Sequence, residues 1–322
     1  MEKNFSKVNL NPSKFAAVGA LVFLYIFFSI FGINFFSYGT LVNILDSSYY
    51  LGFMAVGVTF VIITGGIDLS IGTVMVASAL IGGVAYNNWG LPIGWALFIS
   101  VLTGTLFGFL NGILIAKLGL PPFVATLGSM MMAQGIGAII SQVRTVRFPD
   151  ITQPDGWFKH VFYKSSSGFP VGIIWLALVF VVAYIILYKT KIGRYTFAIG
   201  SNEEAVRLSG VNVAKWKIIV YTISGLLSGM ASIMYAAAYT SIVPATGAGL
   251  ELLAIAAVVI GGTSLSGGKG SLSGTIIGVY IMAVLKQGLM SMNLQPHYQT
   301  LFTGIVLVIA VLYDIYRNKK MG

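Results

Sequence analysis

The 322-residue sequence contains no cysteine and few charged residues. The absence of cysteine excludes disulfide scaffolds, thiolate metal sites and cysteine nucleophiles. Charged residues make up only 9% of the chain and hydrophobic residues 57%, whereas soluble domains carry about 25% charged residues. Because so few charges cannot cover the surface of a soluble protein of this size, the composition indicates a polytopic membrane protein.

Recognisable motifs for catalysis and nucleotide binding are absent as well. The sequence has neither a GxxxxGK[ST] P-loop nor a G-x-S-x-G nucleophile elbow, so we expect this chain to bind no ATP and no other cofactor. Its two histidines, His160 and His297, lie in separate predicted loops, without a carboxylate or a second histidine at ligand spacing. We therefore expect no catalytic residue and no metal site.

Apolar runs of about 20 residues, the length that crosses a membrane, recur along the whole chain. They predict an all-α fold in which residues 1–322 form a single transmembrane domain of about ten helices. The predicted spans are residues 15–33, 49–66, 70–86, 93–116, 122–141, 170–188, 218–239, 251–263, 272–291 and 299–316. The eighth is too short to cross at about 1.5 Å per residue, so we expect a broken or re-entrant helix completed by its glycine-rich tail.

The distribution of lysine and arginine predicts the orientation of these spans. Both termini are basic, and so is the loop of residues 189–217, which places all three in the cytoplasm. The loop of residues 142–169 is then extracytoplasmic, although it contains Arg144 and Arg147. The positive-inside rule is weaker for this loop, because the loop is long and contains acidic residues. The net charge of +10 fits this pattern better than nucleic-acid binding, because the basic residues lie in short segments between apolar runs.

Two short segments resemble each other and suggest two related halves. Residues 65–72 read GGIDLSIG and residues 261–268 read GGTSLSGG, each between two apolar runs. The matching positions are Gly65, Gly66, Leu69, Ser70 and Gly72 in the first segment, and Gly261, Gly262, Leu265, Ser266 and Gly268 in the second. Chance similarity between glycine-rich segments is the alternative. Paired helix breaks in transporters mark a pathway or a gate.

Three charged residues lie in or beside the predicted spans, where ionisable groups are expensive. Asp68 either caps the helix that starts near Leu69 or acts as a gate at the cytoplasmic mouth. Glu251 either stabilises the start of the eighth helix or offers a polar contact at the outer mouth. Lys286 either extends its amine to the outer interface or takes part in the pathway.

The loop between the sixth and seventh spans predicts a short, capped helix on the cytoplasmic face. A turn at Ile199 and Gly200 is followed by Ser201 or Asn202 as N-cap. Two glutamates occupy the first turn, an arginine the last, and Gly210 ends the helix. A simple connector is the alternative, but a connector does not need a helix with two caps, whereas a docking surface does.

At this point the sequence resembles the permease subunits of bacterial ABC importers for ribose and related monosaccharides. Three segments carry the resemblance: AVGVTFVIITGGIDLSIG at 55–72, GRYTFAIGSNEEAVRLSGVNVAKWKIIVY at 193–221, and ELLAIAAVVIGGTSLSGGKGSLSGTIIG at 251–278. The resemblance implies an inner-membrane location, two permease subunits, two ATPase subunits that bind the ATP, and an external sugar-binding protein. One departure is Leu253, where the family commonly has an acidic residue, so a role for a carboxylate there does not carry over.

The resemblance also implies that the NEEAVRLSG helix couples to the ATPase. The residues assigned to coupling are Gly200, Asn202, Glu203, Glu204, Ala205, Arg207, Leu208, Ser209 and Gly210. The candidates for the gate or pathway, taken from the paired breaks and the charges, are Gly65, Gly66, Asp68, Ser70, Glu251, Gly261, Gly262, Ser266 and Lys286.

Other functions remain open at this stage. A secondary transporter driven by an ion gradient is the main alternative, although such proteins usually need carboxylates at the middle of a span. A channel or a membrane-embedded enzyme is less favoured, because no selectivity ring or catalytic cluster is present. The sequence predicts neither which sugar is carried, with ribose and galactose or galactofuranose among the candidates, nor whether the two permease subunits are identical.

Overall fold

The computed structural model describes residues 12–321, and these residues are almost entirely helical. The long elements are α1 (Pro12–Phe31), α2 (Tyr38–Ile63), α3 (Ile71–Asn87), α4 (Ile93–Ala116), α5 (Pro122–Ile140), α7 (Gly172–Lys189), α10 (Val213–Ala238), α12 (Leu272–Ser291) and α13 (Pro296–Met321). The short ones are β1 (Val146–Arg147), the 3-10 helix η1 (Pro154–Gly156), α6 (Trp157–Phe162), α8 (Lys191–Ser201), α9 (Glu203–Leu208), β2 (Ser241–Ile242) and α11 (Leu250–Ile260).

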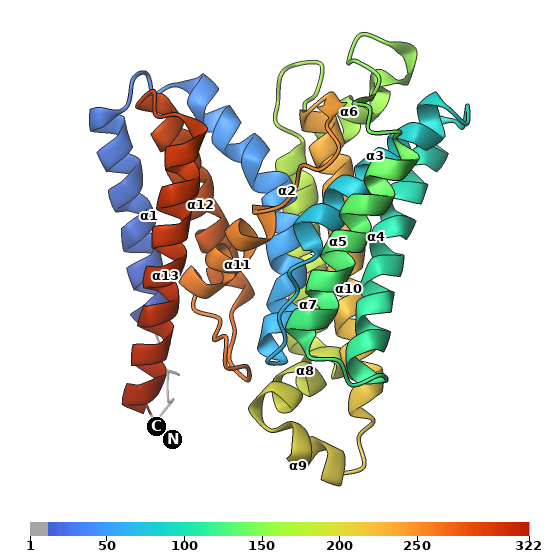
Figure 1. Cartoon of the computed structure of the whole chain (residues 1–322). Helices are drawn as coiled ribbons and strands as arrows, with labels where there is room; N and C mark the ends of the chain where they lie inside the picture. The colour runs from blue at the N-terminus through green and yellow to red at the C-terminus, as the bar shows by residue number, and fades with distance from the viewer. Residues whose placement is uncertain (1–11, 322) are drawn as a thin grey trace, which may run out of the picture.

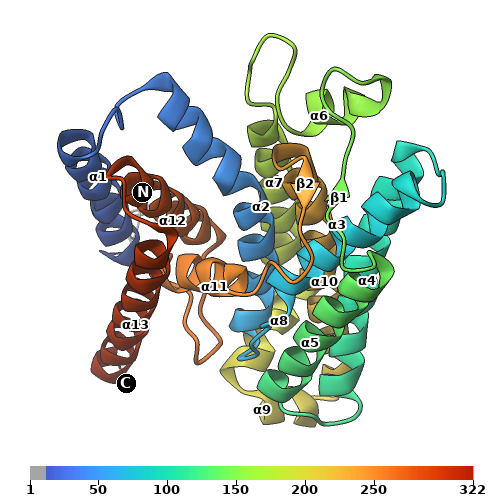
Figure 2. The same ribbon diagram turned by 45° about the horizontal axis from the view of Figure 1, so that its top comes forward.

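Each of the ten predicted spans corresponds to a helix. Six of the described helices are long and apolar enough to cross a membrane, and four shorter apolar helical segments accompany them. The expectation of a short eighth helix is confirmed, because α11 has 11 residues and reaches only about 16 Å. Figure 2 shows α11 lying across the middle of the molecule, beside α2 and α12.

The start of the second helix was predicted too late. We expected it at residue 49, but α2 begins at Tyr38, where Ser37 accepts a hydrogen bond from the amide of Thr40. The polar residues that hid this start make hydrogen bonds inside the helix or with a partner, although one oxygen of Asp46 is buried without a partner. Asp46 accepts a hydrogen bond from the hydroxyl of Tyr163, and Ser47 and Ser48 donate to carbonyl oxygens of their own helix.

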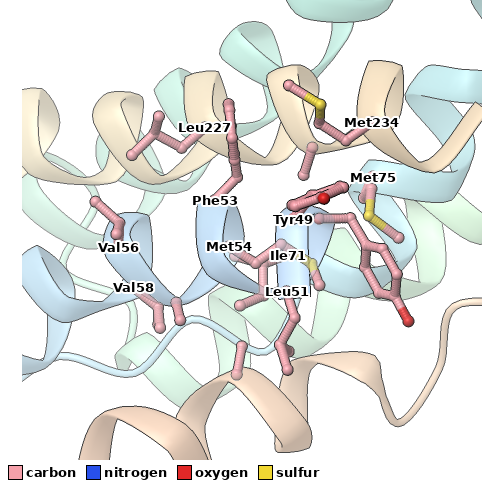
Figure 3. Close-up of a cluster of buried hydrophobic side chains, with 14 of the residues drawn as sticks. Tyr49, Leu51, Phe53, Met54, Val56, Val58, Ile71, Met75, Leu227 and Met234 are labelled. Atoms are coloured by element: carbon pink, nitrogen blue, oxygen red, sulfur yellow. The ribbon is translucent and has the colours of Figure 1, made fainter. Parts of the chain in front are cut away.

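Helix α2 forms the centre of the bundle. Its apolar window is 89% buried, against 28% for α5 and for α7, so the outer helices cover it. Figure 3 shows Phe53 and Met54 of α2 packed among Met75 of α3 and Leu227 and Met234 of α10. This central position puts the end of α2, where the first glycine-rich segment begins, in contact with several other elements.

Small residues bring α4 and α10 close together. Gly104, Gly108 and Gly112 recur every fourth residue on the face of α4 that meets α10. A methyl group on Gly104 would lie 2.5 Å from the amide of Gly229, and one on Gly108 would lie 2.8 Å from the amide of Gly225. Glycine therefore lets these two backbones pack directly on each other, as in other membrane helix pairs.

The functional segments lie at opposite ends of the bundle. In Figure 1, α6 and the rest of the segment 142–169 lie at the top, and α8 and α9 lie at the bottom. The end of α13 lies at the bottom too. The segment 142–169 has a defined structure, because β1 pairs antiparallel with β2, with Val146 opposite Ile242.

Candidate functional site

The two glycine-rich segments meet each other at the end of the bundle that carries α8. The amide of Gly268 donates a hydrogen bond to the carbonyl oxygen of Ile63, the last residue of α2, at 2.9 Å. A methyl group on Gly267 would lie 2.9 Å from the amide of Gly65 and 2.9 Å from the carbonyl oxygen of Gly200. Two breaks that lie far apart in the sequence therefore touch, and α8 touches both.

Gly200 is the residue through which α8 reaches this contact. A methyl group there would collide with the carbonyl oxygen of Ile63 and would lie 2.5 Å from the amide of Gly268. Two of the glycines, Gly65 and Gly267, also have φ angles of +78° and +81°, which residues with side chains rarely adopt. We refer to Ile63, Gly65, Gly200, Gly267 and Gly268 as the glycine junction. Gly200, Gly267 and Gly268 have no room for an added side chain atom, and at Gly65 the backbone conformation itself favours glycine.

The other predicted glycines support the junction from both sides. Gly66 lies against the hydroxyl of Tyr221 in α10, so an added methyl group would collide with that ring. Gly261 ends α11 and packs against the backbone of Gly274, and Gly262 has a φ of +91°. The amide of Ser266 donates to the hydroxyl oxygen of Ser264 at 3.3 Å, which folds the second segment back on itself.

Asp68 is the centre of a buried hydrogen-bond network just before α3. Its side chain is almost inaccessible, and one carboxylate oxygen accepts bonds from the amide of Ser70 at 3.0 Å and from the hydroxyl of Ser70 at 2.6 Å. The other oxygen accepts a bond from the hydroxyl of Ser224 in α10 at 2.9 Å. The amide of Asn111 in α4 donates to the hydroxyl of Ser70 at 2.9 Å. The network ties the start of α3 to α4 and α10.

Asp68 is not the N-cap residue of α3, which is Ser70, but it accepts a hydrogen bond from the amide of that residue. The helix begins at Ile71, two residues later than expected, and Asp68 satisfies the amide at its N-cap. A simple cap would use one oxygen at a helix end, whereas Asp68 uses both and links two further helices. A role in gating stays a prediction.

Glu251 begins α11 as expected, but its side chain is only 6% exposed. One carboxylate oxygen accepts a hydrogen bond from the amide of Gly249 at 2.9 Å. The other has no hydrogen-bond partner and lies where a methyl group on Gly72 of α3 would meet it at 2.7 Å. The side chain is therefore buried between α11 and α3, and a polar contact for a solute at the outer mouth stays a prediction.

Lys286 turns toward α2. Its amine donates a hydrogen bond to the hydroxyl of Tyr50 at 3.4 Å, and Tyr50 lies in the middle of α2. This contact argues against the interpretation that the amine extends to the interface. The ring of Tyr50 also packs edge-on against Tyr235 and Tyr239 of α10.

The predicted coupling helix is present as α9. Asn202 is its N-cap, accepting a hydrogen bond from the amide of Ala205 at 2.9 Å, and Gly210 follows its end with a φ of +81°. Glu203 pairs with Lys217 of α10 at 2.6 Å and with Arg207 at 3.3 Å, which fixes α9 to the next span. Figure 1 shows α9 as the part of the molecule farthest from α6.

The outward side of α9 is open to partners. Glu204, Ala205, Arg207, Ser209 and Gly210 are exposed, and Leu208 is 83% exposed. The expected turn at Ile199 and Gly200 was wrong, because both residues lie inside α8. Because α8 is continuous through Gly200, this residue lies on the face of α8 that packs against the glycine junction.

Sequence reasoning brought together some of these residues and missed others. It found both breaks, Asp68 and Ser70, but not Ser224 or Asn111, which complete the network. A signal was available for Ser224, since Ser224, Ser228 and Ser232 recur every fourth residue in an apolar helix. The sequence carried no comparable signal for Asn111, because a single amide side chain in a predicted span forms no repeating pattern.

Comparison with known proteins adds the family. Residues 40–311 match the family described as the branched-chain amino acid transport system / permease component. The chain is 40% identical over 309 residues to the ribose import permease protein RbsC of Escherichia coli, covering 94% of this chain and 92% of that protein. It is 38% identical to the protein of the same name from Bacillus subtilis, covering 91% and 90%. It is 34% identical to the fructose import permease protein FrcC of Rhizobium meliloti, covering 96% and 87%.

A solved structure shares the fold. It is described as an inward-facing conformation of a putative metal-chelate type ABC transporter, and it matches with a TM-score of 0.50 and 16% sequence identity over 96% of this chain and 99% of that one. This likeness concerns the fold alone. By the family match and by its identity to full-length relatives, the chain belongs to the permease-component family of ABC transport systems.

Proposed function

We propose that this chain is the membrane-spanning permease subunit of an ATP-driven importer and forms the translocation pathway for a monosaccharide. Relatives that match over most of their length are named as import permeases for ribose and fructose, and another as part of an L-arabinose transport system. The observation that carries the proposal is the glycine junction, because it joins α8 directly to both helix breaks. We expect a movement of α8 and α9 to be transmitted through these close backbone contacts to α2 and to the segment after α11.

The proposal includes the partners and their sides. Separate ATPase subunits bind ATP and dock on α9, a sugar-binding protein docks on the α6 end, and a second permease subunit completes the pathway. In this arrangement α9 and both termini are cytoplasmic. The exposed Leu208, beside a helix held by the Glu203–Lys217 pair, is a suitable contact for the groove of a partner.

The orientation can be tested in the cysteine-free background. Ser209→Cys in α9 and Ser166→Cys in the segment 142–169 both place the thiol at an exposed position. In intact cells a membrane-impermeant maleimide should label position 166 only. Labelling of position 209 from outside would overturn the proposed orientation.

An ion-driven transporter remains the second candidate because of one observation. The unpartnered carboxylate oxygen of Glu251 is buried, and buried carboxylates in spans often bind or release protons. ATP dependence separates the two candidates.

The decisive experiment is reconstitution in proteoliposomes with an ABC ATPase and a sugar-binding protein that co-purify with this chain. Uptake of labelled D-ribose, L-arabinose and D-fructose is measured with ATP, with a non-hydrolysable analogue, and with ionophores. We expect ATP-dependent uptake of at least one sugar that ionophores do not abolish. Uptake that follows an imposed proton gradient without ATP would replace the proposal with the second candidate.

A further inference from the structure

Three tyrosines and a lysine from three different helices converge in the half of the bundle that carries α6. The ring centroids of Tyr235 and Tyr239 are 4.7 Å apart, and Tyr50 lies 5.3 Å from Tyr235 and 6.1 Å from Tyr239. The amine of Lys286 reaches the hydroxyl of Tyr50. We refer to these four residues as the tyrosine–lysine cluster.

The amine of Lys286 is poorly satisfied by the protein. It has three donors, and one long hydrogen bond of 3.4 Å joins it to the hydroxyl of Tyr50. The ion pairs among the described residues involve Lys159, Arg207 and Lys217, not Lys286. A cation inside an apolar helix faces the protein interior or a water-filled path, because exposing it to lipid is expensive. The amine of Lys286 is therefore directed into the bundle, toward the three tyrosines, and is free to donate further hydrogen bonds there.

The cluster is accessible from the α6 end. Tyr239 directly follows α10 and is 40% exposed, whereas Tyr50 is 3% exposed and anchors the other two rings. One residue after Tyr239, Thr240 begins the segment whose strand β2 pairs with β1 of the segment 142–169. A solute that arrives at this end meets Tyr239 before it meets the deeper rings.

These groups match the chemistry of a monosaccharide. A sugar ring has an apolar C–H face, which packs on aromatic rings, and a rim of hydroxyls, which accept from an amine and exchange hydrogen bonds with phenols. We infer that Tyr50, Tyr235, Tyr239 and Lys286 form a contact site for the translocated monosaccharide in the outer half of the pathway. The inference rests on the proposed function, and it adds a sugar-contacting site to it.

A purely structural role for the tyrosines is the competing explanation. The chain offers a matched control, because Tyr184 and Tyr188 on α7 have ring centroids 4.7 Å apart and Tyr184 is 43% exposed. That pair has similar aromatic packing and no lysine contact. A structural loss should affect both pairs alike, whereas a lost sugar contact should affect only the cluster.

The test uses a reporter that leaves all four residues intact. Thr246 is exposed and its side chain contacts Tyr235 by a hydrogen bond, so Thr246→Cys places a single thiol beside the cluster. In the complete reconstituted complex, the rate of labelling by a maleimide is measured with 100 mM of the sugar that the wild type imports, and with 100 mM sucrose as the osmotic control. Ser166→Cys is the control for a distant thiol at the same end.

We expect the imported sugar to slow labelling of Thr246→Cys about threefold or more, with no effect of sucrose and none on Ser166→Cys. Adding Tyr239→Ala or Lys286→Met to the reporter should remove this protection, and Tyr184→Ala should retain it. Unchanged labelling in a complex that imports the sugar would overturn the inference and leave the proposed function standing. A complex that imports none of the three monosaccharides would overturn the proposed function itself.

Discussion

The amide of Gly268 and the carbonyl oxygen of Ile63 are joined by a hydrogen bond of 2.9 Å. Ile63 ends α2, and Gly268 lies in the glycine-rich segment that follows α11. Because α2 is the most buried of the six long apolar helices and the short α11 lies across the bundle beside it, this bond couples the centre of the bundle to the segment that follows α11. Gly200 of α8 packs on the same bond, so α8 and both breaks are in direct contact and are expected to move together.

The first prediction concerns this contact. Gly200→Val should reduce ATP-dependent uptake at least tenfold, because its side chain would collide with the Ile63 carbonyl and force α8 away from both breaks. ATPase activity should persist, since α9 remains exposed to its partner. Both are measured in proteoliposomes with equal amounts of assembled complex.

The control for Gly200 is Gly128→Val in α5, where no atom lies within 4 Å of an added methyl group. Uptake by this variant should stay close to the wild-type rate. Wild-type uptake by Gly200→Val would mean that the junction does not transmit movement.

A second prediction follows from the Asp68 network. Asp68→Asn should retain most of the transport, because the amide keeps one acceptor oxygen for Ser70 and the Ser224 hydroxyl can rotate to accept. Asp68→Leu should remove the acceptor of the Ser70 amide and of the Ser70 and Ser224 hydroxyls, at a cost of about 1–3 kcal/mol for each donor left unsatisfied. Thermal stability of the purified complex and sugar uptake are measured side by side. Loss of transport in a fully stable Asp68→Asn complex would show that the negative charge itself acts in gating.

A third prediction concerns Gly82, which lies inside α3 and faces α4. An added methyl group there would collide with the Ser100 hydroxyl and lie 2.7 Å from the carbonyl oxygen of Ala96, in α4. We therefore expect Gly82→Ala to destabilise the protein by about 1–3 kcal/mol, the usual cost of overpacking. Gly94→Ala, which has open space around it, is the matched control in a thermal unfolding assay. Equal melting temperatures for both variants would contradict the close packing of Gly82 against α4.

Hydropathy and glycine patterns predicted the helices and both breaks, because a membrane imposes a length and a composition on each span. They did not predict which elements touch. The contact between Gly200 and Gly268 joins segments that lie far apart in the sequence, and no local pattern encodes such a pairing. The start of α2 was missed for a related reason, since Asp46 is polar in the sequence and accepts the hydrogen bond from Tyr163 only in the fold.

The four residues of the proposed sugar-contact site were only partly predictable from the sequence. Lys286 was found because a charge in a span is conspicuous, but Tyr50, Tyr235 and Tyr239 were not, because tyrosines near span ends are ordinary in membrane proteins. Only their convergence on one lysine makes them informative. The cluster depends on three helices at once, and the sequence gives no information on how those helices face each other.

A fourth prediction concerns pH and the segment 142–169. Lys159 is 3% exposed, and its burial lowers the pKa of the amine, although Asp150 at 4.0 Å opposes the shift. In the unfolded chain the amine has its ordinary pKa, about 10.4. Between the lowered value and the ordinary one the unfolded state binds more protons, so the stability of the folded state rises as the pH rises through this window. Below this pH window the amine is charged in both states, and the folded state carries the full free-energy cost of burying that charge.

The measurement compares the wild type with Lys159→Met by thermal unfolding between pH 7 and pH 10. The methionine side chain is uncharged, so the melting temperature of the wild type relative to the variant should increase with pH. A difference that stays constant over this range would show that Lys159 keeps its ordinary pKa in the folded protein.

The last prediction concerns the partner of α9. Leu208 is 83% exposed, and an apolar side chain held in water on a capped helix is suited to burial in a docking groove. Leu208→Ala should weaken binding of the ATPase subunit about tenfold, which corresponds to about 1.4 kcal/mol. Folding should be unaffected, because the side chain makes little contact with its own chain. Leu118→Ala is the matched control, since Leu118 is 64% exposed in the connection between α4 and α5. Affinity is measured by titrating the purified ATPase onto the permease in nanodiscs. Equal weakening by both variants would assign the docking surface to this whole end of the bundle, and no weakening by Leu208→Ala would remove α9 from the interface.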